Sequence, residues 1–409
     1  MLSLRAKLAV VPLVLSMFMT VTACGGGGSG SSSTNVAPPT PPKPVTGVTQ
    51  SAAIATFDSP FALTFLPDGR MLVTQRSSTY SIANGLSLVT QAGVVVKVAG
   101  LPDSIGVLDV KLAPDYASSG MIYFTYMVQD TSAARVGRGA GDPTLFPQRV
   151  MAARGKLTIT NGQPSLSGVQ VIFSQNPAIV SLPGSGEPGG RMTFSPNGQD
   201  LYISSGDRQE LDATFLFSLT NNIGKIIRIH PDGTIPTDNP FVKTAGALPE
   251  IYTLGHRNPY GLAFAPDGTL WESEMGPMGG DELNVLKPGL NYGWPAVSYG
   301  DNYDGSPIPK PAAGDGYEPS KMWWTPVIAA AGMIFYSGDV FADWKGDVVL
   351  TGLQSQGLVR VRITNGTPAE VQRISLGTRT RDVAQGPDGS LWVLTDGAAG
   401  ELRKLTPVF

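Results

Sequence analysis

Residues 264–274 read FAPDGTLWESE, and this stretch contains the structural unit from which the chain is built. An apolar residue leads into a Pro-Asp-Gly turn, and a segment with alternating side chains follows. Proline presets φ at the first turn position, and glycine accepts the left-handed conformation that such a turn needs. The stretch therefore predicts a β-hairpin.

Variants of this unit recur along the chain. Three close copies and one looser copy are FLPDGRMLVT (65–74), FSPNGQDLYIS (194–204), GPDGSLWVLTD (386–396) and LAPDYASSGMIYFTY (112–126). Long helical periodicity is absent, so recurrent hairpins over about 350 residues predict an all-β fold, a six-bladed β-propeller. A large β-sandwich is the alternative, but it would not need the same turn chemistry to be repeated.

The composition fits a large folded domain. Of 409 residues, 42% are hydrophobic and 15% are charged, which is too much apolar and too little charged sequence for a disordered chain. The formal net charge is −3, and no clustered basic segment is visible. We therefore expect no nucleic-acid partner.

The N-terminus has the features of an export signal. Basic residues precede an apolar run at residues 8–21, which is too short to span a bilayer comfortably. The following Val-Thr-Ala-Cys resembles the lipobox of bacterial lipoproteins, which implies lipidation of Cys24, the single cysteine. We therefore expect a lipid-anchored protein of the cell envelope, facing the periplasm or attached to the outer membrane. An ordinary signal peptide is the alternative.

Three segments follow from these patterns. Residues 1–23 are predicted to be the signal peptide. Residues 24–50, which are rich in Gly, Ser and Pro, form a tether behind the lipidated cysteine. Residues 51–409 form the propeller.

One motif is accidental. GSGEPG (184–189) satisfies the G-x-G-x-x-G pattern of dinucleotide-binding sites. That pattern requires a preceding strand and a following helix, whereas here a strand and a hairpin turn follow. We therefore expect no NAD site.

Residues 252–305 are the most informative run: YTLGHRNPYGLAFAPDGTLWESEMGPMGGDELNVLKPGLNYGWPAVSYGDNYDG. This run resembles the aldose sugar dehydrogenases of the glucose/sorbosone dehydrogenase family, which depend on pyrroloquinoline quinone (PQQ). Weaker resemblance covers most of the domain. It implies a six-bladed propeller, in agreement with the hairpin repeats.

The resemblance also implies a set of cofactor contacts. PQQ is a flat ortho-quinone with three carboxylates, and arginine suits carboxylates because its planar fork binds them in two places. The positions that match the family's cofactor contacts are Arg257, Asn258, Tyr303, Trp324, Arg379 and Arg381.

Calcium is the second cofactor that the resemblance implies. This cation prefers oxygen ligands, and backbone carbonyls are among them. In the family, the calcium beside the quinone lies on the carbonyls that correspond to Gly276 and Pro277. A second calcium uses the positions of Glu282 and Tyr292, with Asp281 adjacent. Asp304 falls where the family approaches the cofactor and its metal.

Three positions on the substrate side depart from the family. The catalytic histidine of the family falls at Glu187, the glutamine near the substrate at Ser104, and a lysine that touches the quinone at Gln354. His256, one of two histidines, lies in the GHRNP turn, where we expect it to hold the loop and not to act as the base. Glu187 is therefore the predicted catalytic base.

We accordingly expect an oxidoreductase that passes a hydride from an aldose sugar or related alcohol to the quinone. A carboxylate serves as base where burial raises its pKa toward neutrality. The electron acceptor stays open. A non-catalytic lipoprotein propeller that binds a sugar, metal or protein is the alternative. A calcium-dependent hydrolase is a third reading, but it leaves the paired arginines unexplained.

Overall fold

The computed structural model describes residues 42–76, 85–137, 145–180 and 186–409. The predicted signal peptide and Cys24 lie outside these residues. Residues 42–409 form one compact unit. No helix of the described ranges is long and apolar enough to cross a membrane.

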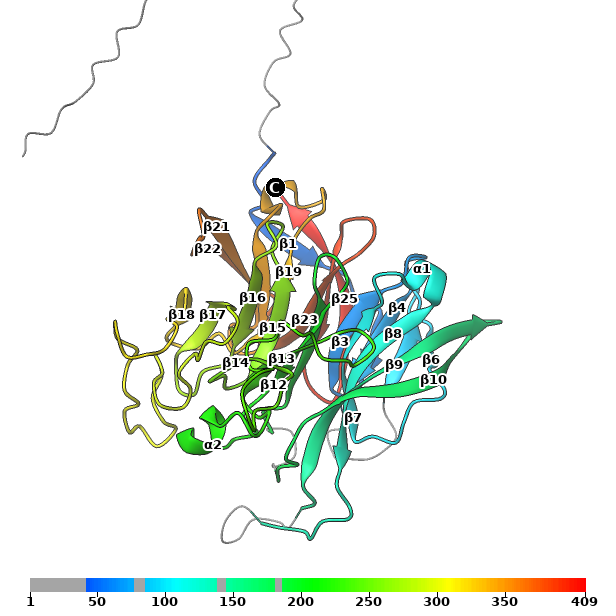
Figure 1. Ribbon diagram of the computed structural model, residues 1–409. Helices are drawn as coiled ribbons and strands as arrows, with labels where there is room; N and C mark the ends of the chain where they lie inside the picture. Colours follow the sequence, from blue (N-terminus) through cyan, green and yellow to red (C-terminus); the bar gives the residue numbers. More distant parts are fainter. Residues whose placement is uncertain (1–41, 77–84, 138–144, 181–185) are drawn as a thin grey trace, which may run out of the picture. The chain divides into compact units, whose positions relative to one another are not determined.

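The unit is a six-bladed β-propeller, as predicted, and each blade is an antiparallel sheet (Figure 1). Two α-helices, α1 (Tyr116–Ser119) and α2 (Ala213–Phe217), and the 3₁₀ turn η1 (Ala342–Trp344) lie in connections between strands. The first blade contains β3 (Pro60–Phe65), β4 (Met71–Gln75), β5 (Leu86–Val89) and β6 (Val95–Lys97). The second contains β7 (Gly106–Leu112), β8 (Met121–Gln129), β9 (Gln148–Thr160) and β10 (Gln163–Ser174). The third contains β11 (Gly189–Phe194), β12 (Leu201–Ser205), β13 (Lys225–Ile229) and β14 (Ile251–Leu254).

The fourth and fifth blades have the same order. They contain β15 (Pro259–Phe264), β16 (Leu270–Glu274), β17 (Asp281–Val285) and β18 (Met322–Trp324); and β19 (Ala330–Phe335), β20 (Val348–Gly352), β21 (Gly357–Thr364) and β22 (Thr367–Ser375).

The sixth blade joins the two ends of the unit. It contains β23 (Thr380–Gln385), β24 (Leu391–Thr395) and β25 (Gly400–Val408), and both β1 (Gly47–Gln50) and β2 (Ala55–Phe57) pair with β25. This pairing closes the ring. It also explains why residues 47–50, which the sequence placed in the tether, form a strand: β25 offers them an unpaired edge.

The predicted hairpin turns connect the first and second strands of five blades. In the fourth blade, Gly268 has φ +84° and its N–H donates to the carbonyl of Ala265 (2.9 Å). The glycine in the left-handed position is thus what the Pro-Asp-Gly pattern predicted.

The first strand of each blade lies on the inside of the ring, where it contacts the first strands of the neighbouring blades. All six of these strands carry a register shift within their first residues. Such bulges redirect side chains. Because the first strands lie together on the inside of the ring, the segments that lead into them meet at one end of it. The candidate site is built from these segments.

Candidate active site

A cavity of about 370 Å³ lies at this end of the ring. Glu187 and Arg257, which precede β11 and β15, line it together with residues of two loops. The charged and aromatic lining consists of Glu187, Asp207, Arg257, Trp294, Tyr303 and Asp304. The structure thus brings five predicted site residues to one cavity: Glu187, Arg257, Pro277, Tyr303 and Asp304.

Arg257 is the central cation of this cavity. Its guanidinium donates to Oε1 of Glu187 (2.5 Å) and to the carbonyl oxygens of Met275 (3.1 Å) and Gly276 (2.8 Å). It also lies 5.4 Å from the ring centroid of Trp294. The side chain is thus buried and held on several sides by charged and polar groups.

Glu187 is held in an unusual backbone conformation. Its φ is +40°, which is costly for a residue with a Cβ. The loop presses against Gly206, where a Cβ would lie 2.0 Å from the carbonyl oxygen of Glu187. Gly206 therefore allows the close approach, and the ion pair with Arg257 directs the Glu187 side chain into the cavity.

Asp207 is a site residue that the sequence reasoning missed. It is buried, and its two carboxylate oxygens accept hydrogen bonds from Nε1 of Trp294 (2.7 Å) and from the backbone N–H of Gln209 (2.8 Å). Burial, and then the negative charge of Glu187, raise the pKa of Asp207 well above its usual value. A polar segment directly after β12, Gly206-Asp207-Arg208, was the available signal.

The other residues of the GHRNP turn hold the turn in place. Asn258 accepts a hydrogen bond from the N–H of Gly189 (3.3 Å), which joins the turn to the Glu187 loop. His256 is buried, and its two ring nitrogens contact Glu274 (3.1 Å) and Thr253 (2.9 Å). This arrangement agrees with the prediction that His256 holds the loop.

A second charged group forms where β23 begins. Arg76, Arg379 and Arg381 all face the carboxylate of Asp396, at 3.6, 3.1 and 2.7 Å. Arg381 is buried between the rings of Phe61 and Tyr260, and burial together with the charge of Arg76 lowers its pKa to about 10. Nε of Arg76 and Nη1 of Arg381 have no hydrogen-bond partner within the described ranges.

The predicted calcium ligands lie close to Arg257. The carbonyl oxygen of Gly276 faces its guanidinium, and a small cavity of about 10 Å³ is lined by Gly276, Glu282 and Tyr292. The hydroxyl of Tyr292 donates to Val285 (2.6 Å) and accepts from the N–H of Lys287 (2.9 Å), so it serves the local fold.

Asp281 and Asp304 also make local contacts. Asp281 is buried and accepts from the N–H groups of Gly276 (2.8 Å) and Ala330 (3.3 Å), and burial raises its pKa to about 6. Asp304 accepts from the N–H of Ser306 (2.8 Å). Asp281 thus joins the Gly276 loop to the fifth blade, and Asp304 shapes a turn at the cavity edge.

Trp324, a predicted cofactor contact, lies outside the lining of the cavity. It is buried between the fourth and fifth blades, and its Nε1 donates to Glu370 (2.7 Å). It is not among the residues that line the cavity, and neither are Ser104 and Gln354. Gln354 is exposed and Ser104 is half-buried.

Fold and site together define a class of protein. Its members are six-bladed propellers with a charged cavity at the end where the inner strands begin. The model of the glucose/sorbosone dehydrogenase family matches residues 57–404. The chain belongs to this family, which confirms the predicted resemblance.

Several relatives have known names or structures. The aldose sugar dehydrogenase of Escherichia coli K12 is 35% identical over 366 residues, which cover 86% of this chain and 90% of that protein. The crystal structure of the soluble E. coli aldose sugar dehydrogenase in its apo-form has a TM-score of 0.76, with 32% identity and coverage of 88% and 100%. The PQQ-bound aldose sugar dehydrogenase of Streptomyces coelicolor has a TM-score of 0.64, with 25% identity and coverage of 89% and 99%.

Proposed function

We propose that the protein is a PQQ- and calcium-dependent dehydrogenase that oxidises an aldose sugar or a related alcohol, with Glu187 as the proton acceptor. The observation that carries this proposal is the cavity in which Glu187 and Asp207 flank the buried guanidinium of Arg257. Relatives named as aldose sugar dehydrogenases, one of them PQQ-bound, support the substrate and cofactor classes.

The residues present fit a polycarboxylate cofactor. Three guanidinium groups share the single carboxylate of Asp396, and two of their buried N–H groups lack a partner within the described ranges. An anionic ligand would supply that partner and balance the surplus positive charge. Arg379, Arg381, Arg257 and Asn258 are the residues that would hold PQQ, with Tyr303 at the cavity edge. When bound, PQQ supplies an acceptor for the hydride.

The oxygen atoms near Arg257 fit calcium. Backbone carbonyls are among the ligands that this cation prefers, and the carbonyls of Gly276 and Pro277 belong to a loop that borders the cavity. Glu282 and Tyr292 would hold a second ion beside the small cavity that they both line. Asp281 supports this loop by accepting the N–H of Gly276.

Glu187 has the placement that a general base needs. A base must be ionised and must reach the proton that it removes. The ion pair with Arg257 stabilises the negative charge of Glu187, and the cavity gives a substrate hydroxyl access to the carboxylate. Asp207, whose raised pKa favours its neutral form, hydrogen-bonds Trp294 and keeps this wall of the cavity in place.

Reconstitution tests this function. PQQ is added to the purified protein with and without Ca²⁺, and quinone absorbance and dye reduction are followed on a panel of aldoses and alcohols. Turnover that requires both additions supports the proposal. Calcium-dependent binding without turnover on any substrate would favour the non-catalytic propeller, and absence of PQQ binding would overturn the cofactor assignment.

We also propose that the mature chain is anchored to the cell envelope through lipidated Cys24. The apolar run before Cys24 and the Gly/Ser/Pro-rich segment after it support this location. Cys24→Ser is expected to release the protein from the membrane fraction or to block processing. Wild-type protein that is wholly soluble and cleaved at another site would contradict the anchor.

A further inference from the structure

A buried acidic cluster lies directly below the GHRNP turn. Register pairs Glu272 with Asn284 and Glu274 with Glu282 across strands β16 and β17. Because side chains alternate along a strand, all four lie on one face of the sheet. Glu272 and Asn284 are fully buried, and Glu274 is 4% exposed.

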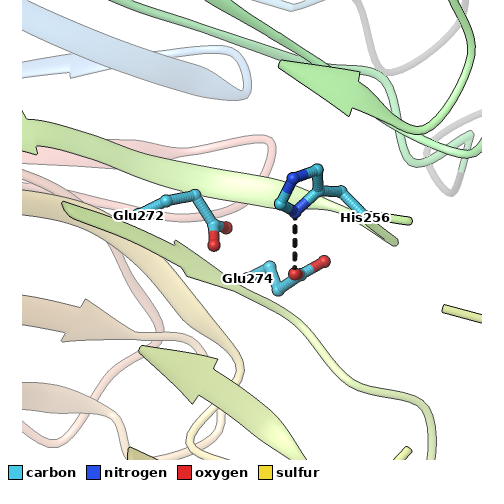
Figure 2. Close-up of side chains that lie close together, drawn as sticks. All are labelled: His256, Glu272 and Glu274. Carbon is cyan, nitrogen blue, oxygen red and sulfur yellow. Dashed lines mark hydrogen bonds and ion pairs between the residues drawn. The ribbon is translucent and has the colours of Figure 1, made fainter. Parts of the chain in front are cut away.

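His256 completes the cluster from the turn before β15. Figure 2 shows its ring and the carboxyl groups of Glu272 and Glu274 pointing toward one another. Nδ1 of His256 is 3.1 Å from Oε1 of Glu274. One ligand atom from each of these three residues lies within 4.8 Å of the other two.

Hydrogen-bond donors are scarce around two of the carboxylates, Glu272 and Glu282. Nδ2 of Asn284 lies 3.1 Å from Glu272, 3.3 Å from Glu274 and 3.2 Å from Glu282. An amide nitrogen carries two hydrogens, so it cannot satisfy three acceptors at once. Within the described ranges, no arginine or lysine side chain forms an ion pair with these carboxylates.

An independent signal comes from Asn284 itself. Its amide group points into the cluster, since Nδ2 contacts all three carboxylates, yet Oδ1 is buried without a hydrogen-bond partner within the described ranges. Oε1 of Glu272 is in the same situation. An unsatisfied buried oxygen is costly, and a cation between the carboxylates would satisfy Oε1 of Glu272. Turning the amide over would bring Oδ1 toward such a cation.

We propose that His256, Glu272 and Glu274 bind one divalent transition-metal ion, with Oδ1 of Asn284 as a further ligand. An imidazole nitrogen combined with carboxylates suits Zn²⁺ or Mn²⁺, whereas Ca²⁺ takes oxygen ligands. Glu274 also lines the small cavity beside Glu282 and Tyr292, so the proposed site adjoins the second calcium position and differs from it in its imidazole ligand.

The ion would have a structural role beneath the cavity. His256 is followed by Arg257, whose backbone N–H donates to Oε2 of Glu274 (2.5 Å). A metal on His256 and Glu274 would therefore fix the turn from which the Arg257 side chain enters the cavity. Since metal binds the folded chain, loading the site should raise the thermal stability.

Metal analysis of the wild-type chain is the first test. Chelator-treated protein is dialysed against Zn²⁺ or Mn²⁺ in millimolar Ca²⁺, which saturates sites built from oxygen ligands. We expect one transition-metal ion per chain, a higher melting temperature, and an anomalous diffraction peak between His256, Glu272 and Glu274. Wild-type protein without a stoichiometric ion, or with a peak elsewhere, would overturn the proposal.

Glu272→Gln sharpens the test, because it keeps the side-chain size and removes the charge. Its affinity for Zn²⁺ and Mn²⁺ should fall roughly ten-fold or more, whereas Glu401→Gln, in a half-exposed ion pair with Arg403, should bind as wild type does. Equal affinity in Glu272→Gln would sink the ligand assignment. Should that variant fail to fold, the wild-type diffraction experiment decides. These readouts do not involve PQQ or turnover, so their failure leaves the proposed dehydrogenase function untouched.

Discussion

The two charged groups where the inner strands begin have opposite excesses of charge, one of carboxylates and the other of guanidiniums. Around Arg257, two carboxylates, Glu187 and Asp207, face one guanidinium, whereas around Asp396 three guanidiniums face one carboxylate. An excess of buried acid favours holding or accepting protons, and an excess of buried cation favours binding an anion. Under the proposed function, the carboxylates of the acid-rich group would take part in proton transfer and the cation-rich group would bind the cofactor.

Replacing Glu187 is expected to have the largest effect. Glu187→Gln keeps the size of the side chain but cannot accept a proton, so turnover should fall roughly 10²–10⁴-fold. PQQ affinity should stay nearly unchanged. Steady-state kinetics of the reconstituted protein give the result, with Glu401→Gln as the control. A variant as fast as wild type would mean that the acid-rich group does not carry out proton transfer.

Removing Arg379 and Arg381 together tests the cation-rich group around Asp396. Arg379→Ala combined with Arg381→Ala should weaken PQQ binding by roughly 2–5 kcal/mol, the usual cost of truncating a buried charged pair. Arg403→Ala, which removes an arginine from an ion pair elsewhere in the sixth blade, should leave affinity unchanged. Isothermal titration checks both. If the double variant binds PQQ normally, the surplus of cations has another purpose.

The pH dependence of stability tests the buried acid Asp207. The folded-state pKa of Asp207 is raised, mainly by burial and then by Glu187. The contribution of Asp207 to the free energy of unfolding is therefore present below the unfolded pKa and is lost as pH rises through the folded pKa. Asp207→Asn cannot titrate. The variant should therefore lose about 1 kcal/mol through a poorer hydrogen bond at low pH and gain on wild type as pH rises. Urea denaturation across the pH range measures this; parallel curves would contradict a raised pKa.

The smallest effect is expected for Arg379 alone. Its side chain is 51% exposed, compared with 4% for Arg381, although both contact Asp396. An exposed ion pair contributes about 0–1 kcal/mol, so Arg379→Ala should barely change the free energy of unfolding in the absence of cofactor. Arg381→Ala should cost more because it leaves Asp396 without its closest partner. A large loss for Arg379→Ala would show that the two arginines are not distinguished by burial.

Turn chemistry made most of the fold readable from the sequence. Five blades carry a recognisable turn between their first two strands, because proline and glycine fix the backbone locally. The blade formed by β19–β22 has no such turn signal. Its connection at residues 336–347 forms η1 and buries Trp344, without a Pro-Asp-Gly signal. Closure of the ring by β1 was also missed, since the edge of β25 that pairs with it is more than 350 residues away.

Side-chain direction limited the site prediction. Trp323 and Trp324 are adjacent, yet one is 48% exposed and stacks on Tyr299, and the other is buried between blades. Successive residues of a strand face opposite sides, so the pairing of Trp324 with Asp281 in β17 decides which ring goes where. The Trp323-Trp324 pair in the sequence contains no information about that register.

The sequence by itself determined the hairpins, the family and part of each charged group, namely Glu187 and Arg257 in one and Arg379 and Arg381 in the other, because turn signals and motifs are local in the chain. Only the tertiary structure decided which charges meet. Asp207 joins Glu187 and Arg257, and Glu272 joins His256, through the packing of strands that are separate in sequence. Burial, which sets the pKa of Asp207 and leaves Asn284 unsatisfied, arises only when neighbouring strands and blades exclude water from these groups.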